Sequence, residues 1–166
     1  LTTGSKKAFL TACGESPYGH ADDDIVHKLD EVSGIGLLTA SALKTAVGKP
    51  ERFASGRHLS AWLGMTPNEY SSGERRRLGC ISCKGNTYVR TLLIHGARAA
   101  LLAAKRCQTR TPERLTQLQR WALQTAERIG HNKAAVALAN KLVRICWAVW
   151  CHERRFSGDW QSARPA

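Results

Sequence analysis

The residues best suited to chemistry lie together between positions 70 and 86, in the stretch YSSGERRRLGCISCKGN. Ser72 precedes Gly73, and a serine in this setting can act as a nucleophile because the glycine lets a substrate backbone approach closely. No histidine or aspartate that could activate the hydroxyl stands nearby in the sequence, and a loop serine more often caps or hydrogen-bonds. The residues alone therefore leave three readings: a solvated loop, a metal knuckle, or a nucleophile among phosphate-binding groups.

Several basic residues follow this serine in the sequence. The chain of 166 residues has 25 Lys and Arg against 13 Asp and Glu, a net charge of +12 and a pI near 9.9. The residues placed to neutralise phosphates in and beside the stretch are Arg75, Arg76, Arg77 and Lys84. Such an excess predicts a polyanionic partner, of which nucleic acid is the usual one. The alternative is a small helical interaction protein with an incidental positive charge.

Two cysteines in the same stretch, Cys80 and Cys83, have the CxxC spacing of a metal knuckle. A structural zinc site needs four ligands, and the remaining candidates are Cys146, Cys151 and His152 at an apolar segment. A thiol in such a segment is ordinarily buried. We therefore expect no metal at the cysteines and no cofactor bound by this chain.

Helices must position these residues, because the apolar spacing is helical over most of the chain. Helices are expected near 24–32, 37–47, 57–63, 86–105, 112–130 and 132–151, and the last of these, apolar apart from Lys141 and Arg144, should be the central core helix. The expected fold is mainly α: a helix-hairpin-helix followed by a small helical bundle, with an irregular basic loop or short hairpin at about 65–85. Residues 1–21 should be a poorly structured segment, 22–156 the helical domain and 157–166 a frayed tail.

A glycine turn in LDEVSGIGLLTASAL, residues 29–43, joins the first two expected helices. Gly34 and Gly36 permit a tight turn whose free backbone N–H groups suit a phosphate oxygen. The alternative is an ordinary αα-hairpin whose glycines only let two helices pack. The start of the later long helix at Gly85 and Asn86 offers a similar helix N-terminus. The candidate nucleic-acid-binding residues are thus Gly34, Gly36, Gly73, Arg75, Arg76, Arg77, Lys84, Asn86 and Arg90.

Three segments carry a resemblance to a known family: VSGIGLLTASAL, RFASGRHLSAWLGMTPNEYSSGERRRLGCISCKGNTYVRTLLIHGARAAL and GHNKAAVALANKLVRICWAVW. In this order, over about residues 24–150, they are similar to the C-terminal transposase domain of the Piv-like DEDD transposases of bacterial insertion sequences of the 110/1111 group. The resemblance implies that Ser72, in the S-G pair after the L-G-x-x-P segment, is the DNA nucleophile, and that the neighbouring Ser71 is not. It also implies double-stranded DNA as substrate, a guide RNA encoded by the element, and homo-oligomers.

The sequence departs from that family in two ways. The family's N-terminal RuvC-like domain, which supplies four acidic metal ligands, has no counterpart in these residues, so Mg²⁺ is expected only together with that domain. Cys80 and Cys83 stand where the family usually has basic residues. We therefore expect a truncated or partial transposase, carrying the serine and binding DNA but unable to cut it alone.

A different class of function is the alternative: a standalone helix-hairpin-helix module that binds nucleic acid without catalysis. No apolar run reaches the roughly 18 residues of a membrane span, and the beginning of the sequence lacks the apolar core of a signal peptide. No membrane association is expected, and the protein should be cytoplasmic and associated with the bacterial nucleoid.

Overall fold

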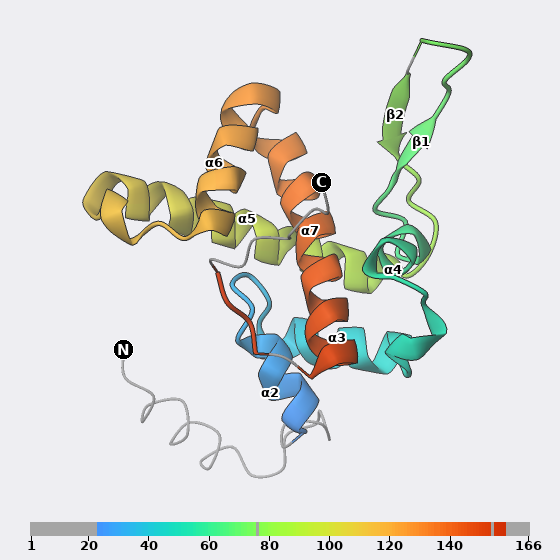
Figure 1. Cartoon of the computed structure of the whole chain (residues 1–166), viewed down its shortest axis with the longest axis horizontal. Coiled ribbons are helices and arrows are strands. Elements are labelled where there is room, and N and C mark those ends of the chain that lie inside the picture. Colours follow the sequence, from blue (N-terminus) through green and yellow to red (C-terminus); the bar gives the residue numbers. More distant parts are fainter. Residues whose placement is uncertain (1–22, 76, 154, 159–166) are drawn as a thin grey trace, which may run out of the picture.

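The computed structural model describes residues 23–75, 77–153 and 155–158, and the fold is mainly α, as predicted (Figure 1). The predicted segment 1–21, residues 159–166 of the predicted tail, and Arg76 lie outside the described residues. The helices are α2 (Asp24–Asp30), α3 (Leu37–Val47), α4 (Gly56–Trp62), α5 (Thr87–Arg110), α6 (Gln117–Ile129) and α7 (His131–His152). Two 3₁₀ turns, Pro50–Arg52 and Pro112–Arg114, and two strands, β1 (Pro67–Glu69) and β2 (Leu78–Ile81), complete the described elements.

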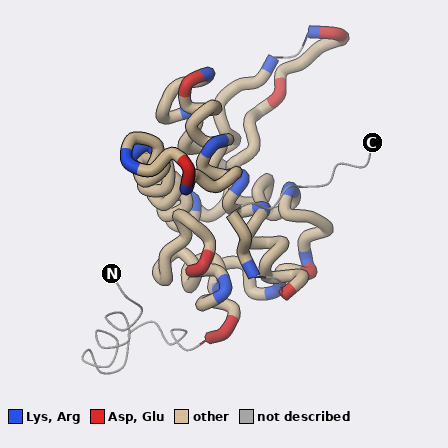
Figure 2. Tube along the Cα trace, turned by 60° about the vertical axis from the view of Figure 1, so that its left-hand side comes forward, with Lys and Arg blue, Asp and Glu red and all other residues tan. Residues whose placement is uncertain are grey.

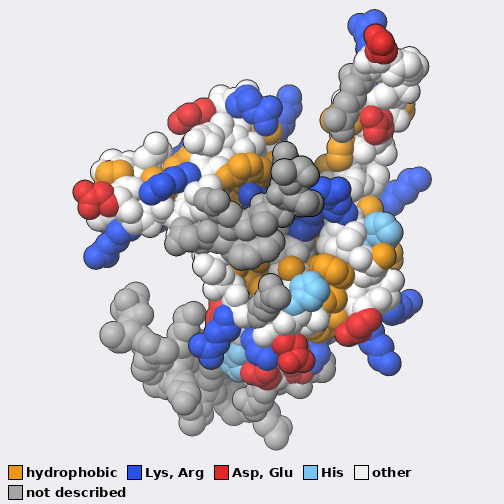
Figure 3. Space-filling model, in the orientation of Figure 1, with side chains coloured by type: hydrophobic (Ala, Val, Ile, Leu, Met, Phe, Trp, Pro, Cys, Tyr) orange, Lys and Arg blue, Asp and Glu red, His pale blue; other side chains and the backbone are white. Residues whose placement is uncertain are grey.

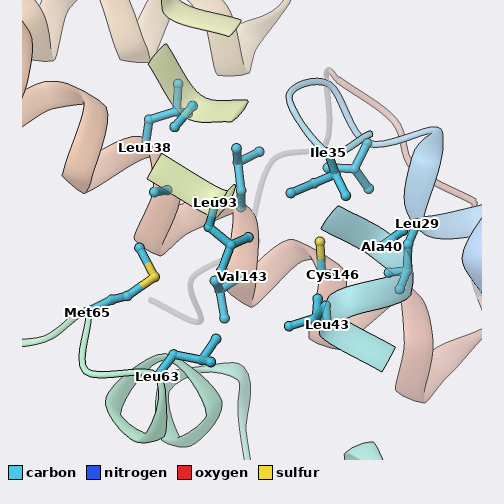
Figure 4. Packing of buried hydrophobic residues seen from close by; sticks show 14 of the residues in the cluster. Leu29, Ile35, Ala40, Leu43, Leu63, Met65, Leu93, Leu138, Val143 and Cys146 are labelled. Carbon is cyan, nitrogen blue, oxygen red and sulfur yellow. The ribbon is translucent and has the colours of Figure 1, made fainter. Parts of the chain in front are cut away.

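Helix α7 lies at the centre of the molecule and packs against α2, α4, α5 and α6. Its side chains at helical spacing, Leu138, Leu142 and Cys146, are almost fully buried. Figure 4 shows Leu138 and Cys146 among core residues of the other helices. By length and composition α7 could cross a membrane, but half of its most apolar 18-residue window is buried inside the protein. The prediction that this is the central core helix is confirmed.

The helix boundaries around Pro112 differ from the predicted ones. Helix α5 continues to Arg110, five residues beyond the expected end, because no glycine or proline interrupts it before Pro112. Pro112 begins only a 3₁₀ turn, and α6 begins at Gln117 instead of 112. The reason is a reciprocal cap: Thr116 Oγ1 accepts from the Gln119 amide at 3.3 Å, and Gln119 Oε1 accepts from the Thr116 amide at 3.1 Å.

The segment expected to be a loop or a short hairpin is a hairpin. Strands β1 and β2 pair antiparallel, with Pro67 opposite Ile81 and Glu69 opposite Leu78, and the register shifts by one residue between these pairs. This hairpin, residues 67–81, projects from the helical body beside α4 (Figure 1). We call it the arm.

Candidate nucleophile and nucleic-acid interface

Ser72 lies at the tip of the arm. The Ser72 amide donates to the Arg75 carbonyl at 3.3 Å, and the Arg75 amide donates to the Ser72 carbonyl at 3.1 Å, which closes a two-residue turn. Gly73, the first residue of that turn, has φ of +56°, a value that favours glycine. At roughly 3.3 Å per residue, the tip stands about 20 Å from the base of the arm at Thr66. The arm thus carries Ser72 away from the helical body, from which β1 and β2 project (Figure 1).

The two neighbouring serines differ in their hydrogen bonds. Ser71 Oγ donates to Glu69 Oε1 at 2.8 Å and accepts from the Arg77 amide at 3.0 Å, so it ties the two sides of the arm together. The Ser72 hydroxyl is exposed and forms no hydrogen bond with any residue that the structure describes. Of the pair, only Ser72 has a hydroxyl without a hydrogen-bond partner among the residues that the structure describes.

Charges along the arm are mixed. Acidic Glu69 and Glu74 are followed along the chain by basic Arg75 and Arg77, and Figure 2 shows both charges on the projecting hairpin. Arg75, Arg77 and the following Lys84 are all exposed, and within the described part of the chain none of them forms an ion pair. These three side chains are therefore available to phosphate groups.

Close backbone contacts fix the base of the arm. Gly64 has φ of +72°, and a Cβ added there would lie 1.8 Å from the Lys84 carbonyl oxygen. Gly85 has φ of +97°, and its added Cβ would lie 2.1 Å from the Trp62 carbonyl oxygen. The Cys83 amide donates to the Gly64 carbonyl at 3.2 Å. Only glycine lets the two chain segments approach this closely at both places.

Arg90 completes this base from helix α5. The side chain is 7% exposed, and its guanidinium donates to the carbonyls of Leu63 at 3.1 Å and Lys84 at 3.4 Å, and to Thr87 Oγ1 at 3.2 Å. The donors thus join the two chain segments that enter and leave the arm. We predicted Arg90 as a nucleic-acid contact, but the structure gives it an internal role; its place three residues before the buried Leu93 was the available signal.

Asn86 likewise has a structural task. Its side-chain oxygen accepts from the Val89 amide at 3.1 Å and caps the N-terminus of α5. The sequence predicted that the long helix begins near this residue. Its role toward phosphate stays a prediction, limited to the exposed backbone beside the cap.

The two glycines of the predicted hinge have different surroundings. Gly34 has φ of +96° and lies against α5: a Cβ on Gly34 would stand 2.9 Å from the Ala100 Cβ, and one on Gly96 would stand 1.9 Å from the Gly34 carbonyl oxygen. Gly36 is exposed, begins α3 without a side-chain cap, and has no atom within 4 Å of an added Cβ. Helices α2 and α3 do pack together, but only Gly36 leaves its helix start open.

The acidic residues at the start of the described chain are used internally. Asp23 pairs with Lys44, and Asp24 pairs with Lys28 at 2.6 Å. The hydrogen bond from Lys28 and its charge hold the pKa of the Asp24 carboxyl below its ordinary value. These carboxylates stabilise α2 and its contact with α3, and α2 lies on the opposite side of the molecule from the arm (Figure 1).

No group of three or more His, Cys, Asp or Glu side chains is arranged to hold a metal ion among the residues that the structure describes. Cys80 and Cys83, the CxxC pair, are exposed free thiols on β2 and just beyond it. The described residues therefore do not fit the divalent metal that the resemblance implies. What they offer is an exposed hydroxyl at the tip of the arm, in the same turn as the exposed Arg75.

Comparison with known proteins identifies related sequences. The model of the transposase family IS116/IS110/IS902 matches residues 26–113, which includes the arm and ends before α6. A probable family 20 transposase of Pseudomonas aeruginosa is 44% identical over 79% of this chain and 37% of its own length. The transposase of insertion sequence element IS1111A of Coxiella burnetii is 38% identical over 78% of this chain and 34% of its own length. The chain thus spans little more than a third of these curated relatives.

Proposed function

Since the chain belongs to the transposase family IS116/IS110/IS902, we propose that it is the DNA-binding part of a transposase and that Ser72 is its nucleophile. The observation that carries the proposal is the contrast between the two serines of the arm. Ser72 offers an exposed hydroxyl without a hydrogen-bond partner among the described residues, whereas Ser71 is held by Glu69 and the Arg77 amide. A nucleophile must be free to reach its substrate, and a projecting tip provides that access.

The proposed reaction is a transesterification. Ser72 Oγ forms a bond to the phosphorus of a DNA phosphodiester while the bond from phosphorus to the leaving sugar oxygen breaks. The serine proton goes to a base, and the leaving oxygen takes up a proton, so no oxidant or further reactant is needed. Arg75 and Arg77 are close enough in sequence and exposed enough to neutralise the non-bridging oxygens, where negative charge increases.

The described residues supply neither metal ligands nor a base at Ser72. We assign both to a RuvC-like domain that carries the acidic residues and Mg²⁺, as the greater length of the relatives allows. A guide RNA and self-association of the full-length protein belong to the same proposal. The work would take place on bacterial DNA, in the cytoplasm at the nucleoid.

A second candidate function is nucleic-acid binding without catalysis through the helix-hairpin-helix. The open start of α3 at Gly36 favours it, because nothing in the described chain covers the backbone there. Gly36→Val would hinder a close phosphate while the exposed position keeps the fold. Retained duplex binding by this variant, together with an unchanged helical circular-dichroism signal, would rule the hinge out as a phosphate contact.

The chemical proposal is tested by locating the attachment site. The chain is combined with an intact RuvC-like domain from a close relative, guide RNA, Mg²⁺ and DNA, and the digested product is analysed by mass spectrometry. We expect a nucleotide attached to Ser72. Attachment at another residue, or none with a demonstrably active partner domain, would overturn the assignment.

A further inference from the structure

Three basic side chains gather on the helical body, where α4 packs against α7. Lys141 and Arg144 are three residues apart on α7 and so lie on the same side of the helix. The first residue of α4, Gly56, packs so closely on α7 that an added Cβ would lie 2.9 Å from the Arg144 Cα. Arg57 follows directly and is exposed. Figure 3 shows Lys and Arg side chains on the helical body near the foot of the arm.

These cations repel one another. Partial burial, and then the charge of Arg57, lower the pKa of the Arg144 guanidinium. Partial burial, and then the charge of Arg144, lower the pKa of the Lys141 ammonium. No carboxylate contributes to either shift. Burial and mutual repulsion therefore make the charged forms of Lys141 and Arg144 less favourable than they are in water.

Nothing in the described chain compensates for this. None of the three side chains forms an ion pair with a described acidic residue, and the buried Arg144 Nε donates no hydrogen bond. Lys141 lies over the Trp121 ring, 4.2 Å from its centroid, which fixes the ammonium without neutralising it. Partly buried, unpaired like charges cost folding free energy, so an anionic partner would relieve them.

We propose that Arg57, Lys141 and Arg144 form a binding site for phosphates of a DNA strand that runs across α7, separate from the arm. An arginine guanidinium can donate two parallel hydrogen bonds to a phosphate, and lysine supplies a compact charge. The net charge of +12 favours a polyanion over a single carboxylate. The family model ends at residue 113 and so assigns nothing to α7. The inference rests on the proposed DNA-binding function, but not on the role of Ser72.

The test is a salt titration of duplex DNA binding, followed by fluorescence anisotropy, with the chain as it exists. The site variant carries Arg57→Gln, Lys141→Met and Arg144→Met. Loss of three phosphate contacts should make the slope of log affinity against log salt shallower by about 2.7. A matched control removes three exposed cations from the far end of α5: Lys105→Met, Arg106→Gln and Arg110→Gln. Its slope should change by less than about 1.

Equal slope changes in the two variants would overturn the site, as would no change in either. If the unmodified chain fails to bind DNA, the DNA-binding part of the proposed function fails as well. Failure of Ser72 as nucleophile leaves this titration unaffected, so the two outcomes are distinguishable. Poly-glutamate of equal charge should displace DNA poorly; equally good displacement would identify an acidic protein partner and overturn the assignment to DNA.

A melting experiment separates binding from folding. Because Arg144 is partly buried beside like charges, Arg144→Met should raise the melting temperature without DNA while weakening DNA binding. Duplex DNA should then raise the melting temperature of the variant less than that of the unmodified chain. A variant that melts lower and binds DNA as before would show a purely structural arginine and overturn the proposal.

Discussion

The arm and helix α7 are held in place by different forces. Along α7, Leu138, Leu142 and Cys146 are buried to 2% exposure or less, and the helix is fixed by apolar packing. In the arm, Tyr70 is 68% and Leu78 is 49% exposed, so burial contributes little there. The arm keeps its shape through its strand pairing, and it is fixed in place by backbone contacts at its base. Because its side chains are exposed, the tip can present a reactive group while contributing little to the stability of the fold. Its position then depends on the rigid base.

The sharpest contrast between the two regions concerns their thiols. Burial raises the pKa of the Cys146 thiol to about 12 from an ordinary value of 9.0, whereas Cys80 and Cys83 on the arm side are exposed. Since only the thiolate reacts, Cys146 should be alkylated at pH 8 about a thousandfold faster once the chain is unfolded in urea. Mass spectrometry of timed samples measures this. Rapid labelling of Cys146 in the folded chain would contradict the packing described for α7.

The raised pKa of the Cys146 thiol also determines in which direction stability changes with pH. Because the folded value lies above the unfolded one, the contribution of Cys146 to stability is complete below about pH 9 and declines as pH rises toward 12. Cys146→Ala should remove that part of the alkaline loss of stability.

Two Leu→Ala substitutions, one in each region, compare how much the regions contribute to the free energy of unfolding. Leu142→Ala removes a fully buried side chain and should lower the free energy of unfolding by about 2 to 5 kcal/mol. Leu78→Ala, on the exposed arm, should change it by about 0.5 kcal/mol or less. Urea denaturation of both variants provides the comparison. A loss of similar size at the two positions would mean that the arm is buried in solution.

Substitutions at two glycines distinguish the base of the arm from its tip. Gly64→Ala combines a positive φ with a collision against the Lys84 carbonyl, and should cost about 2 kcal/mol or more. Gly73→Ala has a positive φ but no atom within 4 Å of the new Cβ, and should cost about 1 kcal/mol. Hydrogen exchange at the Ser82 and Cys83 amides should accelerate only for Gly64→Ala. If both variants accelerated exchange equally, the contact at Gly64 would not be what fixes the arm in place.

Arg90 tests the base of the arm in a second way, and its expected cost is smaller than that of Gly64→Ala. Arg90→Met removes the donors to the Leu63 and Lys84 carbonyls and should lower stability by about 1 to 2 kcal/mol. Because the guanidinium faces protein carbonyls, the salt dependence of duplex binding should keep its slope. A slope shallower by about 1 would mean that Arg90 contacts a phosphate after all.

The spacing of apolar residues was sufficient to predict the helices and the central position of α7, because that spacing depends directly on which side chains are buried. It could not find contacts between distant segments. Gly34 against Gly96, and Arg90 against the Leu63 carbonyl, join residues 62 and 27 positions apart, and neither pairing leaves a local pattern. The later start of α6 was missed because Pro112 matched the start of a helix as well as it matched a turn. Ser72 was selected over Ser71 through the family resemblance, while their hydrogen bonds required the structure.

The central claim is that the free hydroxyl at the tip, and not its bonded neighbour, attacks DNA. The decisive measurement is a denaturing gel of the reaction with a RuvC-like domain from a close relative, guide RNA, Mg²⁺ and labelled DNA. The unmodified chain and Ser71→Ala should both form a covalent protein–DNA adduct, and Ser72→Ala should form none. An adduct that survives Ser72→Ala and disappears with Ser71→Ala, or that survives both substitutions, would contradict the account.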